Sequence, residues 1–372
     1  MSLGSPIDPG DLFEELCSIP SPSLGEAAVG RTVCGLLDQI GIPWETDGAA
    51  AKLGGDQDNI HAVLPGADGA TEGGILLAAH LDTVPPGDSL RPILDGGVWR
   101  NAGDGILGAD NKAAVTAVVC AAAAWASVRP KVPVEILFTV AEEIGLLGAH
   151  AFPLDRLSSR LAFVFDHPSP LGTFVEVSPG HTRVAVGIRG RTAHAGVRPE
   201  EGANAIRAAA KAIAAIPNGR LSESSTANVG LISGGTAGNV VPANCEFEFE
   251  IRSAEEGDAA SILLEATDAT QAAADSEGCS ADLGVSRSFS GYRHSDSHPA
   301  LKVGSAALES LGLEPLGVAS GGGSDGNVFE AAGIPTLNFG DGSIDTHTPD
   351  ERISDSDLRR LVELTLALPE LA

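Results

Sequence analysis

The order of apolar runs along the chain is the feature that most constrains its fold. From the N-terminus to about residue 178, short apolar runs bounded by Gly or Pro alternate with longer alanine-rich runs. The short runs are typical of buried strands, expected at 74–79, 134–140 and 161–165, and the run at 112–126 is typical of a helix. Because strands and helices alternate, the pattern predicts an α/β architecture.

The order of elements changes in the middle of the chain. Residues 180–288 read as strand, helix, strand, strand, helix, strand, and this βαββαβ order is typical of a ferredoxin-like sandwich. After this segment the α/β pattern resumes, and a closing helix is expected from Asp357. A chain of 372 residues is long enough for two cores. We therefore expect a mixed-sheet α/β domain of residues 1–179 and 289–372, with a ferredoxin-like domain of residues 180–288 inserted into it.

The composition narrows the range of partners. The formal net charge of −27 disfavours binding to nucleic acid, which requires a surplus of Lys and Arg. No segment offers about 18 uninterrupted apolar residues, and the N-terminus lacks a basic and apolar leader, so neither membrane insertion nor secretion is expected. The 5 cysteines are scattered without CxxC spacing, as expected for buried thiols in a reducing compartment. These features favour a cytoplasmic protein.

Polar side chains that could bind metal follow the expected strands. In LLAAHLDTVP, a buried strand ends at His80, and Asp82 lies two residues further on. Residues two apart in an extended chain point the same way, so Asp82 can accept the second ring N–H of His80 and orient the other nitrogen toward a metal. A solvated hydrogen bond at the end of a strand is the alternative interpretation.

Other acidic and histidine residues occupy similar positions. Glu142 and Glu143 follow an apolar strand directly, and two adjacent carboxylates repel each other unless a cation or proton lies between them. Asp110 lies in a glycine-flanked turn before a helix, Asp166 closes the run LAFVF, and His347 precedes the last helix. Each could instead be a helix-capping or surface residue. Together they lie mostly at the carboxyl ends of core strands, where open α/β sheets build their sites.

This ordered set resembles the metal-site signature of the M20 metallopeptidases, particularly the peptidase T-like enzymes. Further blocks resemble the family across nearly the whole chain, namely GILGADNKAAV, FTVAEEIGLLGA, GRTAHAGVRPEEGANAI, GGTAGNVVPA and GGGSDGNVF. The peptidase T-like relatives commonly have a second Asp where this chain has Asn111. That departure removes no expected ligand.

The resemblance implies two divalent metal ions per chain. Asp110 would bridge them, with His80 and Asp166 binding one ion and Glu143 and His347 the other. Imidazole and carboxylate ligands suit zinc, with cobalt or manganese as alternatives. Glu142 would act as the general base toward a water shared by the metals, and the peptide bond after Asp110 would be cis.

The resemblance also implies roles for the inserted domain. His194 would stabilise the transition state across the interface of a homodimer formed through this domain, although a lone loop histidine is ordinarily solvent-exposed. Asn239 and Arg252 match positions that contact substrate in relatives, and an ordinary surface ion pair is the alternative for Arg252. Gly322 and Gly323 would allow backbone N–H groups to approach the substrate closely.

The function implied by the resemblance is that of an aminopeptidase acting on tripeptides or similarly short peptides. The alternative is an N-acyl-amino-acid amidohydrolase or a carboxypeptidase-like enzyme, because one metal centre can hydrolyse many amides. A relative that only binds peptides is disfavoured, because every expected ligand and the base are present.

Overall fold

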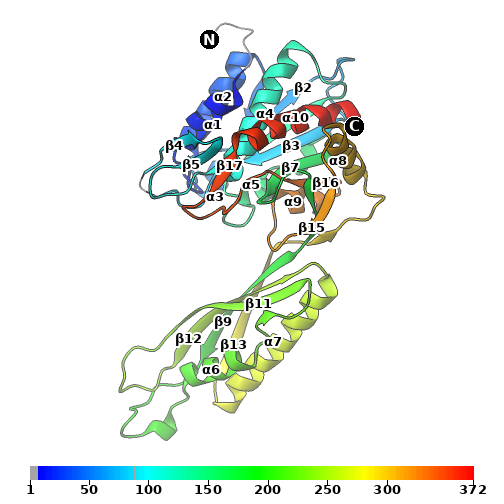
Figure 1. Cartoon of the computed structure of the whole chain (residues 1–372). Coiled ribbons are helices and arrows are strands. Elements are labelled where there is room, and N and C mark those ends of the chain that lie inside the picture. Colours follow the sequence, from blue (N-terminus) through cyan, green and yellow to red (C-terminus); the bar gives the residue numbers. More distant parts are fainter. Residues whose placement is uncertain (1–6, 88) are drawn as a thin grey trace. The chain divides into compact units, whose positions relative to one another are not determined.

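The computed structural model describes residues 7–87 and 89–372, which form two compact units (Figure 1). The larger unit comprises three segments, namely residues up to 176, 294–320 and 324–372. The smaller unit comprises residues 177–293 and 321–323. The larger unit is a mixed α/β structure and the smaller one is an antiparallel sheet with two helices, so the predicted fold class is confirmed.

Four parallel strands form the centre of the main sheet in the larger unit. The strand order is β1-β2-β6-β3-β7-β16-β8, with β15 beside β8, and the strands are β1 (Trp44–Thr46), β2 (Ile60–Leu64), β3 (Ile75–His80), β6 (Val134–Thr139), β7 (Leu161–His167), β8 (Thr173–Ser178), β15 (Leu316–Ala319) and β16 (Thr336–Gly340). The strands β6, β3, β7 and β16 pair in parallel, so their carboxyl ends share one edge. Every residue of β3 and β6 is buried, which explains their nearly continuous apolar sequences.

Helices cover this sheet. They are α1 (Pro9–Cys17), α2 (Ala27–Ile40), α3 (Ala49–Leu53), α4 (Ala109–Ser127), α5 (Leu147–Ala151), α8 (Pro299–Ser310), α9 (Asp325–Ala331) and α10 (Asp355–Leu371), with a 3₁₀ turn at Leu154–Arg156. The alanine-rich α4 is almost wholly buried because it packs against β3, α1 and α10 (Figure 1). A small sheet of β4 (Pro92–Asp95), β5 (Val98–Asn101) and β17 (Arg352–Ser354) completes the unit.

The smaller unit has the expected βαββαβ order. Its elements are β9 (Gly180–Arg189), α6 (Ala205–Ala215), β10 (Gly219–Arg220), β11 (Ser225–Gly234), β12 (Asn244–Ser253), α7 (Glu256–Ser276), β13 (Ser280–Phe289) and β14 (Tyr292–Arg293), with a 3₁₀ turn at Pro199–Glu201. The sheet order is β10-β11-β12-β9-β13. Phe247, Phe249 and Ile251 alternate along β12 and are buried in a core that includes alanines of α6 and α7. This alternation is typical of a sheet with one covered face.

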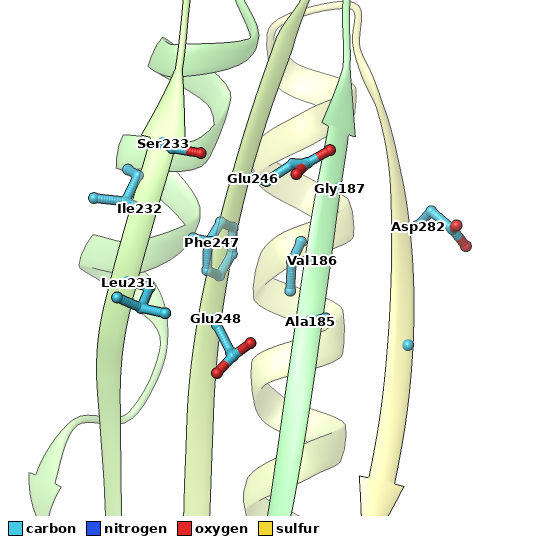
Figure 2. A pocket seen from close by; sticks show the side chains of 11 residues that line it. Ala185, Val186, Gly187, Leu231, Ile232, Ser233, Glu246, Phe247, Glu248 and Asp282 are labelled. Atoms are coloured by element: carbon cyan, nitrogen blue, oxygen red, sulfur yellow. The ribbon is translucent and has the colours of Figure 1, made fainter. Parts of the chain in front are cut away.

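The sheet of the smaller unit also carries a pocket of about 570 Å³ (Figure 2). Exposed Leu231 and Ile232 line it together with Glu246 and Glu248. None of the site residues expected from the sequence lines this pocket. This pocket is therefore not the site that the sequence predicts.

Two local details differ from the sequence-based expectations. Helix α4 begins at Ala109, and its non-helical residues Asp110 and Asn111 lie inside the first turn rather than in a separate turn before the helix. Strand β7 continues through His167, so Asp166 lies within the strand. The Asn338 side chain bonds both backbone groups of Asp166, which extends the pairing of β7 with β16. Among the described residues, no helix is long and apolar enough to cross a membrane.

Candidate metal centre

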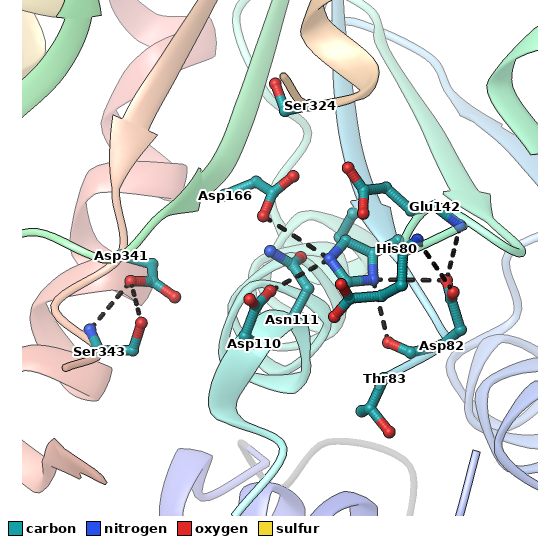
Figure 3. A network of polar contacts seen from close by, with 12 residues as sticks. His80, Asp82, Thr83, Asp110, Asn111, Glu142, Asp166, Ser324, Asp341 and Ser343 are labelled. Atoms are coloured by element: carbon teal, nitrogen blue, oxygen red, sulfur yellow. Dashed lines mark hydrogen bonds and ion pairs between the residues drawn. The ribbon is translucent and has the colours of Figure 1, made fainter. Parts of the chain in front are cut away.

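The expected site residues His80, Asp110, Glu142 and Asp166 converge where the parallel strands of the larger unit end (Figure 3). His80 is the last residue of β3, and Glu142 follows the end of β6. Asp166 lies near the end of β7, Asp110 lies at the start of α4, and His347 lies in the loop between β16 and β17. Five segments far apart in the sequence therefore contribute to one site.

The two carboxylate oxygens of Asp110 face different histidines. Oδ1 lies 3.1 Å from His80 Nε2, and Oδ2 lies 3.1 Å from His347 Nε2. His80 Nε2 also lies 3.6 Å from Asp166 Oδ1, and His347 Nε2 lies 3.1 Å from Glu143 Oε1. The side chains thus form two donor groups that share Asp110, as a carboxylate bridge between two metals requires.

The backbone around Asp110 is held by buried polar contacts. The Asp110–Asn111 peptide bond is cis, as the family resemblance implied. The carboxylate of buried Glu351 accepts the backbone N–H groups of Gly108 at 2.6 Å and Asp110 at 3.0 Å. The amide of Asn111 donates to the Phe165 carbonyl at 2.7 Å. These contacts hold the backbone that carries the Asp110 side chain.

The Asp82 carboxylate contacts the expected His80 ring and further groups as well. The ring Nδ1 of His80 lies 2.9 Å from the backbone carbonyl of Asp82 and 3.4 Å from its carboxylate, so the carbonyl is the closer acceptor. The carboxylate accepts the backbone N–H groups of Glu142 at 3.0 Å and Glu143 at 3.2 Å, together with the Ser23 hydroxyl at 2.7 Å. The expected contact between the His80 ring and the Asp82 carboxylate is thus present at 3.4 Å, and the backbone carbonyl of Asp82 is a second, nearer acceptor. Asp82 contacts His80 through its backbone and its side chain, and it holds the Glu142–Glu143 pair through its side chain.

Burial and mutual charge shift the ionisation of this cluster strongly. Burial opposes a charge on His80, but the adjacent Asp110, Asp166 and Asp82 together raise its pKa well above the usual value. Hydrogen bonds to Asp110 and Glu143 raise the pKa of His347 to about 10. His80 and His347 are therefore protonated on the ring nitrogens that face the carboxylates. A divalent cation would supply the same neutralising charge.

The pKa values of two acids in the site are raised, whereas those of salt-bridged carboxylates are lowered. Burial, followed by the charge of Asp166, raises the pKa of Glu142 well above its usual value. Burial also raises the pKa of Asp166 to about 7, with Asp110 and Asp325 adding repulsion. A crowded set of buried carboxylates is stable as anions only when cations are bound among them.

The chemistry of the donors fits a pair of divalent metals. Ligand atoms of His80, Glu142 and Asp166 lie within 4.8 Å of one another, as do those of His80, Asp110 and Glu143. Imidazole and carboxylate donors suit zinc and similar transition metals. The site therefore offers imidazole and carboxylate donors that lie close enough together to bind metal.

Known proteins are similar to this chain along its whole length. The Peptidase dimerisation domain matches residues 178–277, and Peptidase family M28 matches residues 59–167. The chain is 30% identical over 361 residues to YqjE, an uncharacterized protein of Bacillus subtilis, and the alignment covers 97% of each chain. An aminopeptidase PepT structure from Bacillus cereus has 32% sequence identity and a TM-score of 0.89, with 100% of each chain covered. The chain belongs to the M20 family of metallopeptidases.

A second solved structure supports the same assignment. The metallopeptidase superposes on a tripeptidase from Staphylococcus aureus with a TM-score of 0.91 and 28% identity, covering 99% of each chain. This similarity extends through both units. The protein is therefore a peptidase of the peptidase T-like group.

Two of the expected inserted-domain residues lie next to each other in the metallopeptidase. The backbone N–H of Ala195 donates to the Asn239 carbonyl at 3.0 Å, and His194 forms an isolated β-bridge with Val240. The side chain of His194 accepts the Gly196 N–H at 3.2 Å, and His194 and Asn239 are both exposed. The smaller unit thus presents both residues on one pair of loops.

Arg252 makes the ion pair that was the alternative interpretation. Its Nε lies 3.1 Å from Glu250 Oε1, and its Nη1 donates to the Gly321 carbonyl at 3.2 Å. The expected glycines adjoin this contact, and at Gly323 an added Cβ would lie 2.3 Å from the Phe289 ring. Close packing thus requires glycine at position 323.

The sequence-based reasoning missed several buried acids near the metal centre, namely Glu26, Asp325, Asp341 and Glu351. Asp325 illustrates why, since it directly follows the N-cap of α9 and reads as an ordinary helix-start acid. Folding buries it against the end of β6, where it accepts the Thr139 hydroxyl, and burial raises its pKa to about 6. The block SDGNVF was the one available signal, because it already belonged to the family resemblance.

Proposed function

We propose that this metallopeptidase is an aminopeptidase that removes the first residue of tripeptides and similarly short peptides. The observation that carries the proposal is the position of Asp110 between the two histidines, in a chain similar over its full length to an aminopeptidase and a tripeptidase. The 5 free cysteines suit action in a reducing cytoplasm.

Two divalent metals, with zinc as the proposed ion, would complete the centre. Asp110 would bind both, His80 and Asp166 would complete the protein ligands of one, and Glu143 and His347 those of the other. When bound, such a pair polarises the scissile carbonyl and lowers the pKa of water. Side chains of the protein would carry out the proton transfers and stabilise the oxyanion.

Glu142 is the proposed general base. Its carboxylate is buried next to the ligands, and its backbone N–H is held by Asp82. Burial raises its pKa, and a base with a pKa nearer neutrality is efficient at physiological pH. Glu142 would accept a proton from the attacking water and deliver it to the leaving amide nitrogen.

The inserted domain, residues 180–288, would bind substrate and form a homodimer. The match to a dimerisation domain at 178–277 supports this role. His194 is exposed and would donate to the developing oxyanion in the partner's site. Asn239, Arg252, Gly322 and Gly323 would contact the peptide.

A comparison of free and blocked peptides tests the proposed substrate. Ala-Ala-Ala should be hydrolysed by the zinc-loaded enzyme with release of the first alanine. N-acetyl-Ala-Ala-Ala should be at least about 100-fold poorer, because an aminopeptidase site must pair the free ammonium group. Equal hydrolysis of both peptides, or release of acetate from N-acetylalanine, would assign the enzyme to the amidohydrolases instead.

A further inference from the structure

A second cluster of metal-ligating side chains lies in the larger unit and shares no residue with the metal centre. His294 follows β14, His298 is the N-cap of α8, and Glu330 lies on α9. One ligand atom from each of the three lies within 4.8 Å of the other two. The sequence spacing of the two histidines did not suggest this cluster, because Glu330 joins it only through the fold.

Hydrogen bonds orient the carboxylate of this cluster. Glu330 Oε2 accepts the backbone N–H of Thr336 at 2.7 Å, which leaves Oε1 directed at His298 Nε2, 3.3 Å away. The rings of His294 and His298 are stacked, with centroids 3.9 Å apart and planes inclined by 24°. The Nδ1 atom of His298 is buried without a hydrogen-bond partner among the described residues. The hydrogen bond from Thr336 thus holds the Glu330 carboxylate in place, as outer hydrogen bonds usually hold the ligands of bound metals.

We propose that His294, His298 and Glu330 form a third metal site, selective for zinc or a similar divalent transition metal. Two imidazoles and one carboxylate are a known zinc donor set, with water in the fourth position. Tetrahedral zinc places its ligand atoms about 3.3 Å apart, given metal–ligand bonds of about 2.0 Å. The ligand atoms of the three side chains already lie within 4.8 Å of one another. The ion would link the N-terminus of α8 to α9.

Metal content measured by equilibrium dialysis against buffered micromolar zinc tests this site. The full chain should bind one more ion than either His298→Asn or Glu330→Gln. Exposed His150 provides the matched control, because His150→Asn removes an imidazole outside the cluster and should leave the content unchanged. The cobalt-loaded full chain should also show an absorption band that both cluster variants lack.

The test depends on the difference in bound metal between the full chain and the two cluster variants, and the total metal content does not decide it. Equal metal content in the full chain, His298→Asn and Glu330→Gln would overturn the third site. Circular dichroism checks that both variants fold. This result is independent of the peptidase assay, because loss of one ion in the variants can be measured whether or not tripeptides are substrates.

Discussion

The two units differ in how deeply they bury their polar and charged side chains. The larger unit buries His80, Asp82 and Glu142 at the ends of its parallel strands, each with less than a tenth of its surface exposed. The smaller unit keeps His194 and Asn239 exposed and places its arginine–glutamate pairs mainly at the surface. Burying charges without a cation costs folding free energy, whereas surface pairs have little effect on it. The comparison supports the proposals that the larger unit binds metal and that the smaller unit presents side chains to a partner.

The largest expected effect concerns Glu142. The change Glu142→Gln removes the proposed proton acceptor but keeps the size of the side chain, so turnover should fall by about 10²–10⁴. Bound zinc should stay near the content of the unmodified chain. Kinetics on Ala-Ala-Ala combined with metal analysis checks both statements.

The adjacent carboxylate provides the matched control. Glu143→Gln changes a proposed ligand, whose carboxylate faces His347 at 3.1 Å, and should lose metal as well as turnover. If Glu142→Gln retained substantial activity at saturating metal, its assignment as the base would be wrong.

The sequence predicted the larger unit's site in more detail than the smaller unit's. His80, Asp110 and Asp166 follow or adjoin apolar runs whose strand and helix character is readable, and the shared edge of parallel strands brings such residues together. The contacts of Asp82 with the backbone of Glu142 and Glu143 were not readable, because they join segments that are distant in the sequence. Buried acids such as Glu351 were missed because their surroundings come from distant segments.

In the smaller unit, the elements were predictable but the functional residues were not. The alternating burial of β12 follows from its alternating sequence. His194 and Asn239 lie in exposed loops without periodicity, so the family resemblance alone singled them out. No physical pattern in the sequence distinguishes them from other surface residues.

The second expected effect concerns Asp82, which holds the larger unit's ligands in place. Asp82→Asn replaces one accepting oxygen by an NH₂ group, so the backbone N–H groups of Glu142 and Glu143 can no longer both be paired. The metal affinity should fall by about 10–100-fold, measured by titrating zinc against a chelating indicator. Ser23→Ala removes one donor to the same carboxylate and should have a smaller effect. An unchanged affinity in Asp82→Asn would show that the ligands are held by other contacts.

The smallest expected effect tests the cost of burying acids in the larger unit. Burial raises the pKa of Glu26 to about 7 from 4.5, so the folded state resists the charge that the unfolded state accepts. Its contribution to stability is therefore most favourable below about pH 4.5 and is lost as the pH rises toward about 7. Glu26→Gln removes this titration. Relative to the unmodified protein, the variant's free energy of unfolding should be higher at pH 8 than at pH 4.5, by on the order of 1 kcal/mol.

Urea unfolding of both proteins at the two pH values measures this difference. The exposed Glu309 provides the matched control, as the variant Glu309→Gln measured at the same two pH values. A pH-independent effect of Glu26→Gln would mean that the carboxyl group is not penalised by burial.

Mixing two inactive variants tests most directly whether the two units complement each other across a dimer. His194→Ala should retain its metals and turn over about 10²–10³-fold more slowly, since one donor to the oxyanion is lost. Glu142→Gln is inactive but supplies an intact His194. After subunit exchange, a heterodimer contains one site with both groups, so random mixing should restore about a quarter of the unmodified rate per chain. Recovery of this activity is the predicted result, and no recovery despite demonstrated heterodimers would contradict the shared site.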